Sequence, residues 1–251
     1  MTARTLLIRG MLVGVIAAAL AFAFASVFGE PQIDGAIAFE NAQAHSHGDA
    51  AEPELVTRAV QSTIGLGVAL LLYGTALGGI FAVAFACCHG RLGALEPRAM
   101  ALLVGALGFI AMFLVPFVKY PANPPAVGDH DTIGRRTALY FLMLAVSVLA
   151  TIGAVLVARS LAPRVGSWNA VLVAAGVYIA LAAAAGLLLP AVNEVPADFP
   201  ATLLWRFRLA SVGVQLVLWS TLGLLFGALT DRAERHHAAR QAMSAELART
   251  G

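Results

Sequence analysis

Residues 99–118 read AMALLVGALGFIAMFLVPFV, twenty residues in a row without a charged side chain. A helix of about 20 apolar residues crosses the roughly 30 Å hydrocarbon core of a bilayer. Further runs of this kind occur along the chain, and no segment indicates a strand. The sequence therefore predicts an all-α, polytopic transmembrane helical bundle of about six spans, near residues 10–28, 63–86, 99–118, 137–158, 168–189 and 209–230.

The composition agrees with a membrane protein and narrows the possible functions. Of the 251 residues, 60% are hydrophobic and only 12% are charged, whereas a soluble domain has about 25% charged residues. The single lysine, Lys119, is not preceded by glycine, so the chain lacks the loop that cradles ATP phosphates. No Asp, Glu, Lys or Arg lies within an expected span, which disfavours an ion-coupled carrier with its own relay of ionisable groups. We expect no enzymatic activity, no organic cofactor and no nucleic-acid partner.

The connections between the spans fall into two sets that differ in charge. One set holds ten arginines and four acids: the N-terminus and residues 90–98, 159–164 and 231–251. The other set, which we call the acidic connections, holds six basic and ten acidic residues: 29–58, 119–136 and 190–208. Cytoplasmic loops carry the excess of arginine, so we expect both termini inside and the acidic connections outside. The membrane domain would then cover 1–230, followed by a cytoplasmic tail, 231–251.

The first span has a second interpretation. The N-terminus is similar to a signal peptide, with Arg4 and Arg9, an apolar run after them and then Ala23-Phe24-Ala25. The apolar core of a signal peptide has about 7–15 residues, and this run is longer. A cleaved first span would leave five spans, and residue 45 would lie outside in either case.

Glycines are spaced along the expected spans in a way that favours close packing. Three pairs have three residues between their members: Gly10 and Gly14, Gly74 and Gly78, and Gly223 and Gly227. Because glycine has no side chain, such pairs let two helices approach closely. We expect helix contacts at these positions.

The residues 44–49, AHSHGD, carry a candidate metal site in the first acidic connection. In an extended chain, alternate side chains point the same way, so His45, His47 and Asp49 would face one ion. Two imidazoles and a carboxylate suit Co²⁺, Ni²⁺ or Zn²⁺. The alternative is a solvated polar loop.

A second candidate metal site is Asp129-His130-Asp131 in the next acidic connection. The alternative is an ion-paired cap on a helical hairpin, because arginines follow in the sequence. The expected ion pairs join Arg135 and Arg136 to Asp129 and Asp131, and Arg206 and Arg208 to Glu194 or Asp198.

Two segments carry a resemblance to a known family. Residues 120–150, YPANPPAVGDHDTIGRRTALYFLMLAVSVLA, and residues 199–219, FPATLLWRFRLASVGVQLVLW, resemble the CbtA family of cobalt transporter subunits. The Asn-Pro-Pro-x-x-Gly-Asp and Trp-Arg-Phe-Arg segments are the most specific, and the resemblance extends from the first span to about Ala228.

The resemblance implies a multi-pass subunit of a cobalt importer in the inner membrane of a bacterial cell. It implies Co²⁺ as the transported ion and a small one-span, His-rich partner, CbtB. The family is commonly described with five spans, which agrees with a cleaved first span. A metal-binding scaffold or sensor without translocation, and a membrane assembly factor, remain alternatives. A homo-oligomer is also possible.

Overall fold

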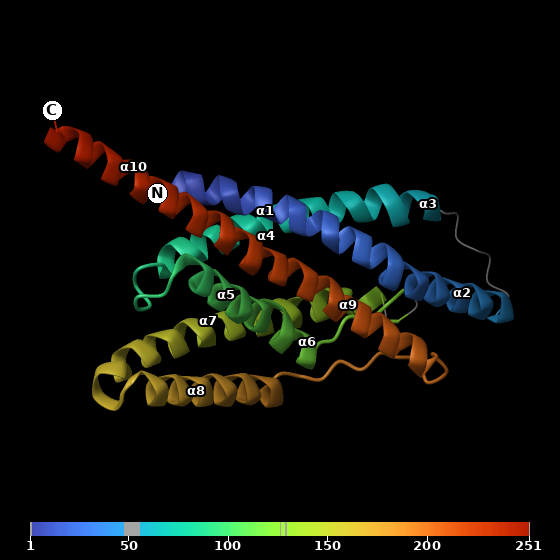
Figure 1. Cartoon of the computed structure of the whole chain (residues 1–251). Helices are drawn as coiled ribbons and strands as arrows, with labels where there is room; N and C mark the ends of the chain where they lie inside the picture. Colours follow the sequence, from blue (N-terminus) through green and yellow to red (C-terminus); the bar gives the residue numbers. More distant parts are fainter. Residues whose placement is uncertain (1, 48–55, 126, 129, 251) are drawn as a thin grey trace. The chain divides into compact units, whose positions relative to one another are not determined.

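The computed structural model describes residues 2–47, 56–125, 127–128 and 130–250 (Figure 1). No strand occurs among these residues, and ten segments are α-helical: α1 Ala3–Phe24, α2 Glu30–His47, α3 Arg58–Val60, α4 Leu66–Cys88, α5 Pro97–Phe109, α6 Val115–Lys119, α7 Ile133–Val165, α8 Ser167–Leu188, α9 Ala201–Thr221 and α10 Gly227–Thr250. Short π-helical turns join several of them without a break: Ala25–Gly29, Gln61–Gly65, Ile110–Leu114 and Leu222–Phe226.

Six helical stretches in the described part of the chain are long and apolar enough to cross a membrane. They are Ala3–His45, Arg58–Cys88, Pro97–Lys119, Ile133–Val165, Ser167–Leu188 and Ala201–Arg249. The prediction of an all-α transmembrane bundle with about six spans is confirmed. The division into a membrane domain, 1–230, and a cytoplasmic tail, 231–251, stays a prediction.

The chain forms two compact units, each built from separate segments. The first unit contains Met1–Phe22, Ile64–Ala106 and Leu216–Gly251. The second contains Ala23–Thr63 and Leu107–Gln215. All three acidic connections therefore belong to the second unit.

Glycines set the contact between α1 and α4 in the first unit, where the two helices lie side by side (Figure 1). Gly10 and Gly14 of α1 lie against the backbone of Gly78 and Gly74 of α4. A Cβ atom added to Gly74 would lie 2.7 Å from the carbonyl oxygen of Gly14 and 2.9 Å from Cβ of Ala18. The two backbones touch directly, which confirms the close approach expected from these pairs.

The third glycine pair brings the last helical stretch close to α5. A Cβ atom added to Gly227 would lie 3.0 Å from Cβ of Ala101 and 3.1 Å from Cα of Arg98. A Cβ atom added to Gly223 would lie 3.5 Å from the carbonyl oxygen of Ala101. Gly227 is therefore the tighter of the two positions.

One end of the first unit carries an aromatic cluster followed by ion pairs. Phe226 packs edge-to-face against Phe81 and Phe85, with ring centroids 5.3 and 5.0 Å apart. Just beyond it, the buried Asp231 lies 2.8 Å from Nε of Arg98 and 3.1 Å from Nε of Arg235. The carboxylate thus joins α10 to the beginning of α5.

The second unit contains a helical hairpin, α7 and α8, that turns at Gly166 (Figure 1). Gly166 has φ of +82°, a conformation that glycine adopts without strain. The hydroxyls of Ser147 and Tyr178 lie 2.9 Å apart and join the two helices. Of the residues in α8, only Ala170 and Ala174 are buried, so most of its apolar surface faces outward, as in a lipid-exposed helix.

The first acidic connection differs from the loop expected over 29–58. Residues Glu30–His47 continue the first helix as α2. The segment is rich in alanine, glutamate and glutamine, which are good helix formers, and its Ala36 is fully buried. The extended chain expected at residues 45–47 is therefore wrong.

Candidate functional site

The three acidic connections meet in the second unit around a small apolar cluster. Ala36 of α2, Val127 and Phe199 are buried together, one from each connection. Phe39 packs edge-on against Phe199, with ring centroids 5.0 Å apart. The cluster places polar residues from distant parts of the sequence next to one another.

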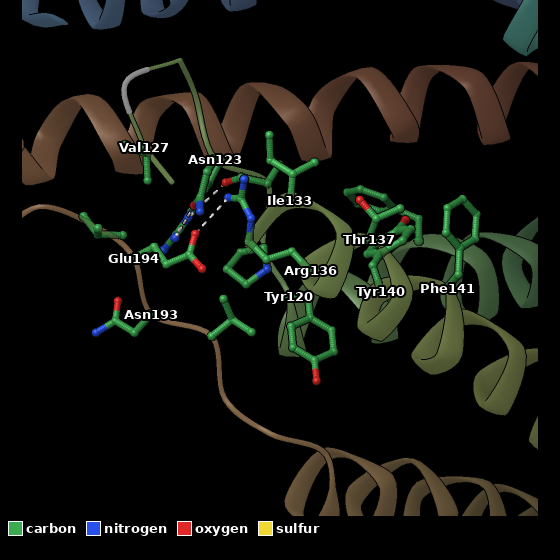
Figure 2. A pocket seen from close by; sticks show the side chains of 16 residues that line it. Tyr120, Asn123, Val127, Ile133, Arg136, Thr137, Tyr140, Phe141, Asn193 and Glu194 are labelled. Atoms are coloured by element: carbon green, nitrogen blue, oxygen red, sulfur yellow. Dashed lines mark hydrogen bonds and ion pairs between the residues drawn. The ribbon is translucent and has the colours of Figure 1, made fainter. Parts of the chain in front are cut away.

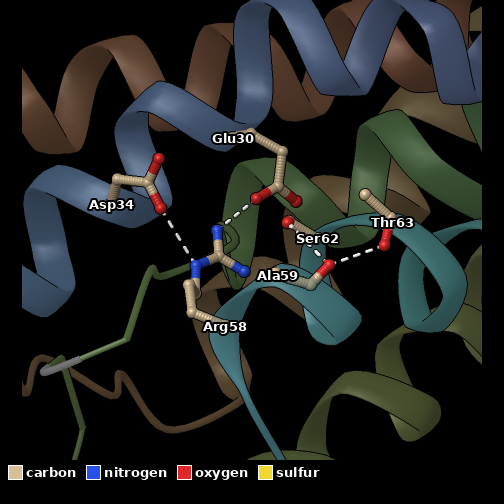
Figure 3. Close-up of polar contacts among 6 residues, drawn as sticks. All are labelled: Glu30, Asp34, Arg58, Ala59, Ser62 and Thr63. Atoms are coloured by element: carbon tan, nitrogen blue, oxygen red, sulfur yellow. Dashed lines mark hydrogen bonds and ion pairs between the residues drawn. The ribbon is translucent and has the colours of Figure 1, made fainter.

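Arg58 holds α2 against the beginning of α3 (Figure 3). Its guanidinium forms an ion pair with Glu30 and donates from Nε to Asp34 Oδ1 at 2.9 Å. The Glu30 side chain is only 12% exposed and Arg58 is 27% exposed. The pair therefore places two charges in a largely desolvated position.

Two further arginines join the other two acidic connections. Arg136 NH1 lies 3.3 Å from Glu194 Oε2. Arg208 donates from NH2 to Asn123 Oδ1 at 3.0 Å and from Nε to the carbonyl oxygen of Ala122 at 3.3 Å. Both contacts run between connections, so each arginine ties one loop to the next.

This arrangement corrects part of the expected ion pairing. Arg136 was expected to pair with Asp129 or Asp131, and the structure shows it paired with Glu194 of another connection; Asp129 lies outside the described residues, so a pair with it stays a prediction. Arg208 was expected to pair with Glu194 or Asp198, and it bonds to Asn123 instead. Asp198 accepts from Gln43 Nε2 of α2. The reason is the tertiary fold, which brings the connections closer to one another than the spacing along the sequence suggests.

A cavity of about 580 Å³ lies among residues of these two connections and the helices that they join (Figure 2). Its polar lining includes Tyr120, Asn123, Arg136, Tyr140, Glu194 and Arg208. Figure 2 shows Arg136, Asn123 and Glu194 close together on one side of the cavity and Phe141 on the other. The cavity thus has a charged side and an aromatic side.

A glycine of the Asn-Pro-Pro-x-x-Gly-Asp segment makes room for one of the arginines. Gly128 has φ of +123°, and a Cβ atom added to it would lie 2.8 Å from Cζ of Arg136. The backbone conformation therefore favours glycine at this position, whereas the Arg136 guanidinium is the end of a flexible side chain and could move.

Tyr120 lines the cavity near the end of α8. Its hydroxyl donates to the carbonyl oxygen of Pro190 at 2.8 Å. Burial raises the pKa of the Tyr120 phenol, and the positive charge of Arg135 lowers it by a smaller amount. The phenol is therefore neutral at physiological pH and keeps its proton for this bond.

The charge of the cavity is unfavourable for a bare metal cation. Among the lining residues that the structure describes, the charged side chains are Arg136, Arg208 and Glu194. Two guanidiniums against one carboxylate leave the cavity positive, and like charges repel a divalent ion. None of the described lining residues is histidine, cysteine or aspartate.

The first predicted metal site lies at the end of α2. His45 is exposed, His47 is the last residue of the helix, and Asp49 lies outside the described residues. Positions two apart on an α-helix are separated by about 200° around the axis. The helical backbone at residues 45–47 therefore differs from the extended chain on which the predicted site was based, and metal contact there stays a prediction.

The second predicted metal site lies just before α7. Asp129 lies outside the described residues, His130 begins the turn His130–Thr132, and Asp131 is exposed. Over the parts of the chain that the structure describes, no group of three or more His, Cys, Asp and Glu side chains is arranged to hold a metal ion.

Most of the residues that line the cavity were not predicted from the sequence as site residues. Asn123 and Arg208 lie in the two segments that carry the family resemblance, and they are in direct contact. That shared membership was the available signal. Tyr140 lies in the first of these segments, one helical turn after Arg136, so the same signal applied to it. Glu194 lies in neither segment, and nothing in its local sequence places it beside Arg136.

The helices and the cavity define a class: a multi-pass membrane protein with polar connections gathered around one cavity. A family described as "Probable cobalt transporter subunit (CbtA)" matches residues 3–231, and the chain belongs to this family. The resemblance read from the sequence is thereby confirmed. A transporter subunit is not an enzyme class, and the word subunit implies a partner. No curated protein and no solved structure matches the chain.

Proposed function

We propose that this chain is the membrane subunit of a Co²⁺ importer, which captures the ion on the outer side and passes it inward with a small one-span, His-rich subunit. The observation that carries the proposal is the family match over residues 3–231 of a chain with six membrane-spanning helices. Ni²⁺ and Zn²⁺ suit the same ligand types, so the choice of cobalt rests on the family.

The proposed orientation places both termini in the cytoplasm of a bacterial cell and the acidic connections outside. The arginine distribution supports it, because cytoplasmic connections carry the excess of basic residues. Retention of the first helix is supported by its packing. Val13, Ala17 and Ala21 of α1 are fully buried, and a helix that forms part of the core contributes to the folded protein.

Six residues of the acidic connections are proposed to contact the incoming ion: His45, His47, Asp49, Asp129, His130 and Asp131. We propose that each of these residues offers the ion a single ligand. Weak single contacts of this kind raise the local concentration of a cation without trapping it. The positive cavity is not part of the proposed cation path.

Alanine substitutions test the capture residues. Replacing His45, His47 and Asp49 together, or Asp129, His130 and Asp131 together, should raise the half-saturating Co²⁺ concentration for uptake. We expect a rise of roughly threefold or more, which corresponds to about 0.7 kcal/mol of lost binding. Uptake of labelled Co²⁺ at a series of concentrations measures it.

The matched control removes histidines at the other end of the chain. His236 and His237 are exposed on α10, and replacing both with alanine should leave the half-saturating concentration unchanged. If the capture variants match the wild-type curve, the two segments are structural connections. If the control variant shifts the uptake curve by the same amount, the effect comes from the loss of histidine in general and not from the capture segments.

A further inference from the structure

Two arginines and one carboxylate are the charged side chains among the described residues that line the cavity of the second unit. Arginine carries five N–H donors. Two nitrogens of Arg208 donate hydrogen bonds to the Asn123 side chain and to the carbonyl oxygen of Ala122. Both acceptors are neutral. These acceptors solvate its guanidinium without neutralising the charge.

Arg136 adds a second, incompletely bonded guanidinium. NH1 pairs with Glu194 at 3.3 Å, whereas its Nε is buried without a hydrogen-bond partner among the described residues. A buried donor without an acceptor is unfavourable, so an added oxyanion would relieve it. Among the lining residues that the structure describes, Arg136 and Arg208 carry two positive charges and Glu194 carries one negative charge.

The surroundings of the cavity resemble the interfacial level of a bilayer. It lies where α6 and α8 end and where α7 and α9 begin. Val118, Leu187 and Leu188 at these helix ends are 76%, 86% and 84% exposed. Tyrosine rings are typical of this level, and Tyr120 and Tyr140 line the cavity.

We infer that this cavity binds a phosphate group, that of an anionic phospholipid, through Arg136 and Arg208. The planar fork of arginine matches the oxygens of a phosphate group. The exposed apolar helix ends beside the cavity give the acyl chains a surface, which free phosphate does not need. The inference does not rest on the proposed cobalt import.

Lipid titration of the purified full-length chain in a neutral detergent tests this inference. Phosphatidylglycerol should bind, as measured by native mass spectrometry and by a rise in the thermal unfolding temperature. Arg136→Gln and Arg208→Gln should each weaken binding about tenfold, because each removes charge-assisted hydrogen bonds. Arg206→Gln is the matched control, since Arg206 lies on the same helix, is exposed and does not line the cavity.

A Glu194→Gln variant separates ligand binding from support of the fold. This substitution removes the carboxylate that competes for Arg136, so the phosphate should bind several-fold more tightly. A purely structural role of the Arg136–Glu194 pair predicts unchanged or weaker binding, and that result would overturn the inference. The variant is informative even where an arginine variant fails to fold.

Inorganic phosphate forms the second arm of the experiment. If phosphatidylglycerol stabilises the protein and millimolar phosphate does not, the lipid is the source. If inorganic phosphate binds equally well with the same dependence on Arg136 and Arg208, the lipid assignment is overturned. Equal loss of binding in Arg206→Gln, or no binding in either arm, overturns the site itself.

Discussion

Replacing Gly74 with leucine should remove most of the folded protein from detergent extracts of the membrane. A single Cβ atom at this position would lie 2.7 Å from the Gly14 carbonyl oxygen and 2.9 Å from Cβ of Ala18. Those atoms belong to the neighbouring helix, and its backbone has to move to relieve the overlap. Overpacking of a tight contact costs about 3 kcal/mol or more in a case as severe as this. Fluorescence-detected size-exclusion chromatography measures the folded fraction.

Gly153→Leu is the matched control for this prediction. Gly153 lies in the apolar helix α7, and an added Cβ atom meets nothing within 4 Å. Leucine is also the better helix former, so this variant should extract and elute like the wild type. A normal elution profile for Gly74→Leu would contradict the direct contact of α1 and α4.

Arg58→Ala should destabilise the second unit strongly. It would leave the Glu30 carboxylate, which is 12% exposed, without its cation. Removing one partner of a buried ion pair costs about 3 kcal/mol or more because the other charge stays desolvated. A lower thermal unfolding temperature of the purified protein is the expected result.

The two acids that contact Arg58 should respond differently. Asp34 is 61% exposed, so Asp34→Asn should cost less than about 1 kcal/mol. A double variant, Arg58→Leu with Glu30→Leu, should recover most of the stability, because it replaces both charges by apolar groups. If Arg58→Ala and Asp34→Asn cost the same, or if the double variant is as unstable as Arg58→Ala, the pair is not desolvated as described.

The helical spans and their glycine contacts could be predicted from the sequence because both depend on short stretches. Residues 99–118 are apolar throughout, and water-free surroundings leave a helix as the only choice for such a stretch. The Gly74 contact follows from a pair of glycines one helical turn apart. The π-helical turns, such as Ala25–Gly29, could not be predicted in this way, because no residue type in the sequence indicates where they lie.

The candidate site was harder to predict because its geometry is tertiary. The polar composition of Glu30–His47 indicated a loop, whereas burial of Ala36 and packing of the partly buried Phe39 against Phe199 favour a helix there. Arg136 and Arg208 were recognised as ion-pairing residues, but their partners lie on other connections. Only contacts over long sequence distances decide such pairings.

The central claim is that this chain carries Co²⁺ into the cell as a subunit of a transporter. Accumulation of radiolabelled Co²⁺ tests it most directly, in cells that express the chain together with a one-span, His-rich partner. Matched cells carry an empty vector, the chain alone or the partner alone. Binding of Co²⁺ to the purified chain is measured in parallel.

We predict that cells with the chain and the partner accumulate Co²⁺ above all three controls, and that the gain is smaller with the capture variants at low Co²⁺. Binding without accumulation would favour a metal-binding scaffold or sensor. Accumulation equal to the empty-vector control, with both subunits present in the membrane, would contradict the claim of transport.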